Sequence, residues 1–150
     1  MLATPWPDRK PGCLFLAAPY AGRVILHLLT ATDWSRLRSD TTLSPASLAT
    51  EGFVHCTGDD DTLLAVANRF YTTVDETMVV ISLDVARLTA SVKWEPPAHP
   101  DGRAAAPDDP LFPHVYGPLE LAAVRVVRSA ERTPEGTFTG FGAPLPLAGD

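Results

Sequence analysis

Cysteine is scarce in this chain of 150 residues, which contains only Cys13 and Cys56. Two cysteines are too few for a disulfide scaffold and have no metal-ligand spacing to each other, so we expect buried or incidental thiols. Long apolar runs are also lacking, since no segment approaches the roughly 20 apolar residues of a membrane-spanning helix. The apolar stretch 13–18 is shorter than the roughly 7–15 residues of a signal-peptide core. We therefore predict a soluble, cytoplasmic protein without a membrane partner.

An excess of basic residues is lacking too. The chain has 12 Lys and Arg against 18 Asp and Glu, which gives a formal net charge of -6. An acidic surface disfavours nucleic acid as a partner. It leaves room for a small phosphate-bearing molecule, because one arginine or one helix N-terminus can bind such a group. We expect a small-molecule ligand, no nucleic acid, and a monomer or weak homodimer.

The composition is that of a globular protein, with 45% hydrophobic and 20% charged residues. A chain of this length fits one domain, which we place at residues 23–142. Residues 1–22 hold four prolines and no lasting periodicity, which indicates an irregular N-terminal extension. Residues 143–150 are expected to form a C-terminal tail.

Hydrophobic patterning predicts strands and helices that interleave along the chain. The first helix is expected to begin at Thr30 or Thr32, the second to begin at Ser44 and end at Gly52, and the third to span about 59–71. Strands are expected at 24–29, 53–56, 78–83, 92–95, 121–127 and 137–141, with a turn at 85–88 and a long loop at 96–110. The last third is rich in strands and lacks the helices that parallel crossovers require. The pattern therefore favours an α+β fold with a mostly antiparallel sheet.

Three of the four histidines, His27, His55 and His114, lie in apolar or strand-like surroundings. A histidine is costly to bury unless its ring nitrogens are satisfied, so each one alone is explained as well by a structural role. Three together indicate a site. Their spacing is not that of metal ligands, and we expect no metal. Cys56 directly follows His55, and neighbours on a strand point to opposite faces, so the two cannot form a nucleophilic pair.

The segment 112–119, FPHVYGPL, combines two prolines and a glycine with a histidine and a tyrosine. The prolines and the glycine indicate a fixed, irregular backbone. His114 and Tyr116 would share a side if the segment were extended, which suits substrate recognition or proton transfer. A structural turn with a packed aromatic ring is the alternative.

Glu95 follows Trp94 and precedes two prolines, a setting in which burial would raise its pKa enough for acid–base catalysis. An exposed glutamate at a strand end is the alternative. Ser47 lies where its hydroxyl could reach a ligand, although turn formation explains a serine there equally well. Trp34 and Tyr116 are aromatic residues that could stack on a planar ligand or simply pack in the core.

These features recur together in one family. The chain resembles the bacterial family catalogued as domain of unknown function 952 over roughly residues 23–140. The resemblance is carried by an Ile-Leu-His strand at 25–27, Trp34, Ser47-Leu48, EGFVHCT at 51–57 and FPHVYGPL at 112–119. At the level of fold, that family is similar to ADP-ribosyltransferase-like proteins. The resemblance thus implies a split, mostly antiparallel sheet with flanking helices around a cleft for a nicotinamide–adenine dinucleotide.

The resemblance also implies residue roles. The superfamily's site combines a first-strand histidine or arginine, a middle tyrosine or serine and a late glutamate. His27 matches the first position, Ser47 or His55 the second, and Glu95 or His114 the third. His27 is then expected to contact the ribose or adenine.

The other motif residues receive roles from the same resemblance. It implies a cleft lined by histidines, with His27, His55, His114 and Glu95 as catalytic residues. The residues expected to bind substrate are Trp34, Ser47, Thr57 and Tyr116. NAD would be a substrate, and no bound cofactor is expected.

Three functions remain open on this evidence. The first is a small ADP-ribosyltransferase-like enzyme or nucleotide-binding protein. The second is a cofactor-free acid–base enzyme of bacterial specialised metabolism, such as a cyclase, isomerase or hydrolase, because imidazoles, a phenol and a carboxylate suffice for proton transfer. The third is a ligand-sensing or interaction module without catalytic activity.

Overall fold

The computed structural model describes residues 23–97 and 109–147, and the expected N-terminal extension lies outside these residues. The helices are α1 (Ala31–Asp40), α2 (Ala46–Thr50) and α3 (Asp60–Phe70), with 3-10 turns η3 (Val85–Arg87) and η4 (Leu121–Ala123). The strands are β1 (Val24–Thr30), β2 (Thr42–Leu43), β3 (Val54–His55), β4 (Met78–Asp84), β5 (Val92–Glu95), β6 (Phe112–Val115), β7 (Leu119–Glu120), β8 (Val124–Arg132) and β9 (Phe138–Leu145). None of the helices within these ranges is long and apolar enough to cross a membrane.

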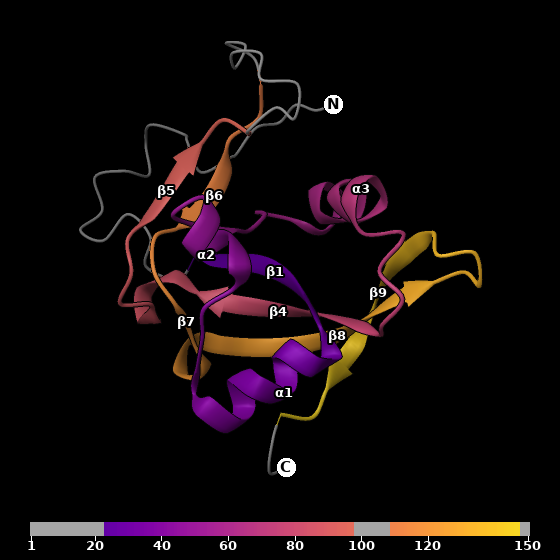
Figure 1. The fold of residues 1–150 in the computed structure, drawn as a ribbon, viewed down its shortest axis with the longest axis horizontal. Helices are drawn as coiled ribbons and strands as arrows, with labels where there is room; N and C mark the ends of the chain where they lie inside the picture. Colours follow the sequence, from indigo (N-terminus) through magenta and orange to yellow (C-terminus); the bar gives the residue numbers. More distant parts are fainter. Residues whose placement is uncertain (1–22, 98–108, 148–150) are drawn as a thin grey trace.

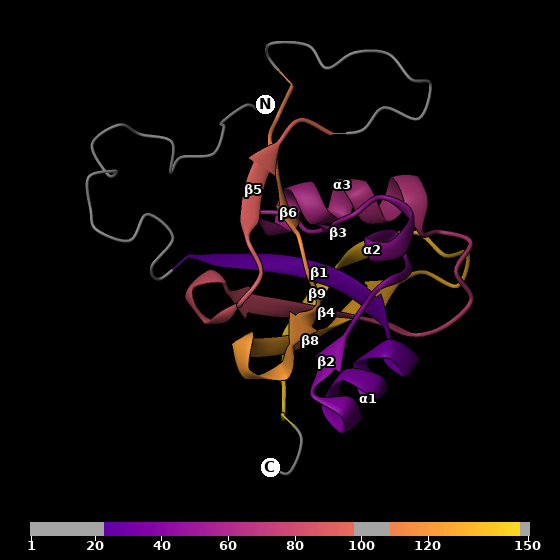
Figure 2. The same ribbon diagram turned by 60° about the vertical axis from the view of Figure 1, so that its left-hand side comes forward.

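The strands form separate antiparallel sheets. The main sheet has the order β1-β4-β8-β9, the small sheet has the order β3-β6-β5, and β2 pairs with β7. In Figures 1 and 2, β5 and β6 run across the direction of the main-sheet strands. The predicted class, a single α+β domain with mostly antiparallel sheets, is confirmed.

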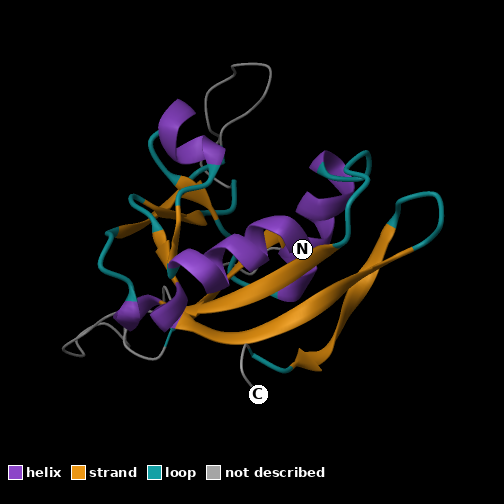
Figure 3. Cartoon of the chain, turned by 60° about the horizontal axis from the view of Figure 1, so that its bottom comes forward, coloured by secondary structure: helices purple, strands orange, loops and turns teal. Residues whose placement is uncertain are grey.

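The main sheet is covered on both faces. Ile25 and Leu29 of β1 pack with the buried side chains of α1, whereas Leu26 and Leu28 pack with those of α3. This alternation follows from the two-residue period of a strand. The two helices therefore lie on opposite faces of the sheet, whose long strands twist strongly in Figure 3. Every residue of β4 is buried, as expected for a strand between two neighbours under two helices.

The helix starts follow capping chemistry in two of three cases. The side chain of Thr30 caps α1 by accepting a bond from the backbone N–H of Asp33, and Asp59 caps α3 in the same way. The start expected at Ser44 is wrong, because Pro45 is the N-cap residue, with an extended ψ of 155°, and α2 begins after it without a side-chain cap. Gly52 has a φ of 91°, the left-handed conformation expected after this helix.

The last third departs most from the prediction. Residues 121–123 form η4, so the strand expected there begins at Val124. The final strand continues to Leu145, into the segment expected to be a tail. The segment expected to be irregular contains β6, which pairs with β3 and β5. Pro113 has no N–H to donate, but its carbonyl accepts a bond from the N–H of Cys56 at 3.1 Å.

The main and small sheets meet beside β1. Leu26 and Thr57 form an antiparallel bridge with two backbone hydrogen bonds, each 2.8 Å long. Thr57 closely follows β3, so this bridge holds the end of β3 against the edge of the main sheet. As a result, His27 of β1 and His55 of β3 lie next to each other.

Candidate functional site

The small sheet has one apolar and one polar face. Val115 of β6 is paired with Val54 of β3 and Val92 of β5, and this row belongs to the core. The next row pairs His114 with His55 on one side and Lys93 on the other. Residues two apart on a strand share a face. We define the polar face as Phe53, His55, Lys93, Glu95, His114 and Tyr116.

Glu95 is the centre of this face. Its Oε1 accepts hydrogen bonds from the phenol of Tyr116 at 2.6 Å and from Nδ1 of His114 at 2.8 Å. The bond from Tyr116, followed by that from His114, lowers the pKa of Glu95 against the opposing effect of desolvation. The expectation that burial raises this pKa is wrong, because the side chain is 33% exposed and two donors stabilise its charge. Glu95 is therefore a carboxylate at neutral pH.

Tyr116 and His114 stay protonated where they face Glu95. The hydrogen bond to Glu95 raises the pKa of Tyr116, so its phenol remains a donor. Burial lowers the pKa of His114, although the bond to Glu95 opposes this effect. His114 is thus a neutral imidazole that carries its proton on Nδ1.

Phe53 packs among these rings. It stacks on His114 with a centroid separation of 4.0 Å and meets His55 edge-on at 4.9 Å. The ring centroids of His55 and His114 are 5.6 Å apart. Phe53 therefore packs face to face on the imidazole of His114 and contacts the imidazole of His55 through an edge.

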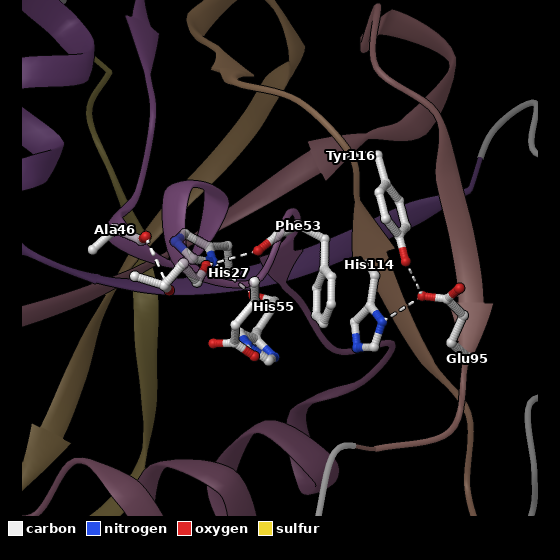
Figure 4. Close-up of polar contacts among 10 residues, drawn as sticks. His27, Ala46, Phe53, His55, Glu95, His114 and Tyr116 are labelled. Carbon is white, nitrogen blue, oxygen red and sulfur yellow. Dashed lines mark hydrogen bonds and ion pairs between the residues drawn. The ribbon is translucent and has the colours of Figure 1, made fainter.

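His27 joins the cluster from the main sheet. Its ring is buried, and its Nδ1 donates to the backbone carbonyl of His55 at 2.9 Å. Burial lowers the pKa of His27, so the ring is neutral and its Nε2 is an acceptor. The residues His27, His55, His114 and Glu95, which come from four different strands, follow one another across the site in Figure 4.

The buried histidines make folding stability depend on pH. The folded pKa values of His27 and His114 lie below their ordinary value of 6.5. The unfolded chain therefore binds more protons, so their contribution is complete above pH 6.5 and is lost as pH falls through the folded values. We expect a lower melting temperature at pH 5.5 than at pH 7.5, measured by circular dichroism.

A variant identifies the source of that loss. In His27→Asn the amide can still donate to His55, but no imidazole is left to protonate. The drop in melting temperature between the two pH values should be smaller than in the wild type. An equal drop in both proteins would show that His27 does not contribute to the acid sensitivity.

The other residues predicted to bind substrate, Ser47, Trp34 and Thr57, are not part of the polar face. The hydroxyl of Ser47 donates to the carbonyl of Phe53 at 2.8 Å, which closes the turn between α2 and β3. Trp34 lies in the core rather than on the polar face, because it occupies the side of α1 that packs on the main sheet. Thr57 is 3% exposed, and among the described residues its hydroxyl has no hydrogen-bond partner. A ligand contact by Thr57 stays a prediction.

Three residues of the site are absent from the sequence-based set. Phe53 packs on the histidines, Glu51 contacts His55, and the ammonium group of Lys93 lies 4.8 Å from the ring centroid of Tyr116. Strand alternation could have found Phe53 and Lys93, since each lies two residues before a predicted site residue. That signal becomes usable only when β6 is recognised as the strand between β3 and β5.

Metal and thiol chemistry receive no support from the geometry. Within residues 23–97 and 109–147, no group of three or more His, Cys, Asp and Glu is arranged to hold a metal ion. Cys56 is buried, and burial raises the pKa of its thiol, which keeps the sulfur protonated and unreactive. Among the described residues, the polar face and its neighbours offer imidazoles, a phenol, an ammonium group and carboxylates.

A comparison with protein-family models places this chain in a family. Residues 28–127 match the model of a family described as protein of unknown function (DUF952). The chain belongs to this family. The match includes β3, β5 and β6, and therefore the whole polar face of this DUF952 protein. No curated protein matches the chain.

Solved structures of one protein share the fold of this DUF952 chain. The crystal structure of protein CC0527 from Caulobacter crescentus has 20% identity and a TM-score of 0.61, covering 77% of this chain and 93% of that one. Its solution NMR structure has 18% identity and a TM-score of 0.57, covering 75% and 89%. At this level of identity the likeness extends to the fold alone.

Proposed function

We propose that this protein is a small ADP-ribosyltransferase-like enzyme that binds a nicotinamide–adenine dinucleotide as substrate and acts on its N-glycosidic bond. The observation that carries the proposal is the continuous cluster from His27 through His55 and His114 to Glu95. The cluster unites a first-strand histidine with a later carboxylate, as the family resemblance implies. Its elements come from both sheets, which suits a ligand bound where the sheets meet.

The geometry supports one choice at each open position. Glu95 suits the late position better than His114, because Glu95 is an ionised carboxylate whereas His114 is a neutral imidazole whose proton is donated to Glu95. His55 suits the middle position better than Ser47, because the hydroxyl of Ser47 already bonds to Phe53. His27, Glu95 and His55 are therefore the residues proposed to contact the substrate.

The chemistry of Glu95 fits glycosidic cleavage. As nicotinamide leaves, positive charge develops on the ribose, and a nearby fixed carboxylate stabilises that charge. Both donors to Glu95 bond to Oε1, and no described residue bonds to Oε2. Oε2 is therefore available for a ribose hydroxyl, while His114 and Tyr116 keep the carboxylate oriented and charged.

Release of nicotinamide tests this function directly. We expect the purified protein to convert the dinucleotide to free nicotinamide, measured by liquid chromatography, at a rate proportional to enzyme concentration. A protein heated above its melting temperature is the control. Absence of nicotinamide release, together with no calorimetric binding of the dinucleotide, ADP-ribose or AMP at millimolar concentration, would contradict the proposal.

A second function is favoured by one observation. The phenol of Tyr116, the carboxylate of Glu95 and the imidazole of His114 form a connected path for protons that requires no nucleotide. Such a path suits a cofactor-free isomerase, cyclase or hydrolase. Loss of a measured proton-transfer activity in Tyr116→Phe, with no binding of the dinucleotide, would favour this function over the first.

A further inference from the structure

A second carboxylate–imidazole pair lies beside the first. Nε2 of His55 is 3.1 Å from Oε1 and 3.2 Å from Oε2 of Glu51. Glu51 follows α2 and His55 ends β3, so the turn that contains Gly52 brings the two side chains together. Because both oxygens of Glu51 face Nε2, that nitrogen carries the hydrogen in neutral His55. Nδ1 is then left with a lone pair that can accept a proton.

This pair differs from the first in its exposure to solvent. The side chain of His55 is 45% exposed, whereas that of His114 is 4% exposed. His55 nevertheless borders the buried part of the site, since its ring lies 5.6 Å from the ring of His114. A basic nitrogen that solvent can reach therefore lies beside the groups that orient Glu95. A general base for an incoming water molecule requires this placement.

We propose that His55, oriented by Glu51, is the general base that activates water, so that the reaction is hydrolysis of the dinucleotide. This assignment rests on the function proposed above. The bond between ribose C1′ and the pyridinium nitrogen breaks, and its electron pair leaves with neutral nicotinamide. A water oxygen bonds to C1′, and one proton of that water passes to Nδ1 of His55 and then to solvent. The products are free ADP-ribose, nicotinamide and a proton.

Glu51 has a positioning role in this scheme. It fixes the ring orientation and the tautomer of His55, as a carboxylate does for the histidine of a catalytic triad. Nitrogen-15 NMR of the wild-type protein at pH 8 should find the hydrogen of His55 on Nε2. A hydrogen on Nδ1 would overturn the assignment, whether or not the dinucleotide is a substrate.

Activity measurements separate this base from a merely structural histidine. His55→Ala and His55→Gln should lower kcat for nicotinamide release by about 10²-fold, with KM changed by less than about threefold. Added imidazole should restore part of the activity of His55→Ala, because the exposed position leaves room for it. Glu51→Gln should lower kcat by about tenfold. Glu95→Gln is the matched control, since imidazole should not restore its activity.

The outcomes distinguish this inference from the proposed function. If the wild type releases nicotinamide and the rate of His55→Ala stays within about threefold of the wild-type rate, the assignment of His55 as the base is wrong and the proposed function stands. If ADP-ribose is found attached to protein instead of free in solution, the assignment of water as acceptor is wrong. If the wild type releases no nicotinamide, the proposed function fails and the hydrolysis fails with it. Circular dichroism of both His55 variants checks that they fold.

Discussion

Glu95→Gln is expected to lower the rate of nicotinamide release by about 10²–10³-fold, the range observed when one preorganised electrostatic group is removed from an active site. The substitution removes the negative charge but keeps an oxygen that can accept from Tyr116 and His114. The polar face should therefore keep its structure. Initial rates at saturating dinucleotide, measured by chromatography, check the prediction.

A glutamate in the separate two-stranded sheet of β2 and β7 provides the control. Glu120 of β7 also accepts two hydrogen bonds, from the backbone N–H and the hydroxyl of Thr89. Glu120→Gln changes a carboxylate of similar local bonding without touching the polar face. It should leave the rate within about twofold. Equal losses in both variants would mean that the effect of Glu95→Gln comes from general destabilisation rather than from lost charge.

Arg132→Met is expected to have the largest effect on stability. The guanidinium of Arg132 donates to the backbone carbonyls of Thr72 at 3.0 Å and Val74 at 2.8 Å, with longer bonds to three other carbonyls. It also lies 4.3 Å from the ring centroid of Phe138. The group thus connects the loop after α3 to the turn between β8 and β9, along an open cavity lined by residues 72–78, Ala130 and residues 132–136.

The size of the effect follows from the number of acceptors left without a donor. Hydrogen bonds to charged groups each contribute about 1.5–3 kcal/mol, and water replaces part of this because the side chain is half-buried. We therefore expect a loss of about 3 kcal/mol in the free energy of unfolding. For a domain of this size, that corresponds to a decrease of roughly 6–12 °C in melting temperature. Urea unfolding followed by circular dichroism measures the free energy.

Arg128 offers a matched arginine on the same strand. Its guanidinium forms two hydrogen bonds with the carboxylate of Asp60, at 2.8 and 2.9 Å. Asp60 is half exposed, so water replaces much of this interaction and Arg128→Met should cost about 1 kcal/mol or less. Similar losses in the two variants would contradict the structural role assigned to Arg132.

Part of the site could be predicted from local sequence. The spacing of apolar residues predicts β1, β4 and α3, and the apolar settings of His27, His55 and His114 single out three side chains that the structure brings close together. Local patterns also placed Tyr116 and His114 on one side of an extended segment. These predictions succeeded because a strand's two-residue period depends only on the chain itself.

The rest depended on contacts between distant segments. The prolines in 112–119 predict an irregular backbone, yet pairing with β3 on one side and β5 on the other makes a strand of Phe112–Val115. The direction of the pKa shift of Glu95 depended on donors 19 and 21 residues away. The sequence predicts that Trp34 binds substrate, although packing of α1 on the main sheet buries this side chain. No local pattern contains this information.

The measurement that tests the central claim most directly is a heteronuclear NMR titration of the protein with ADP-ribose. If the polar face of the small sheet is the site, the largest shift changes should cluster at Phe53, His55, Glu95, His114 and Tyr116, with His27 beside them. Residues 72–78, Ala130 and residues 132–136, which line the cavity beside the turn between β8 and β9, should change little. Saturable changes confined to that cavity, or no saturable change up to millimolar ligand, would contradict the account.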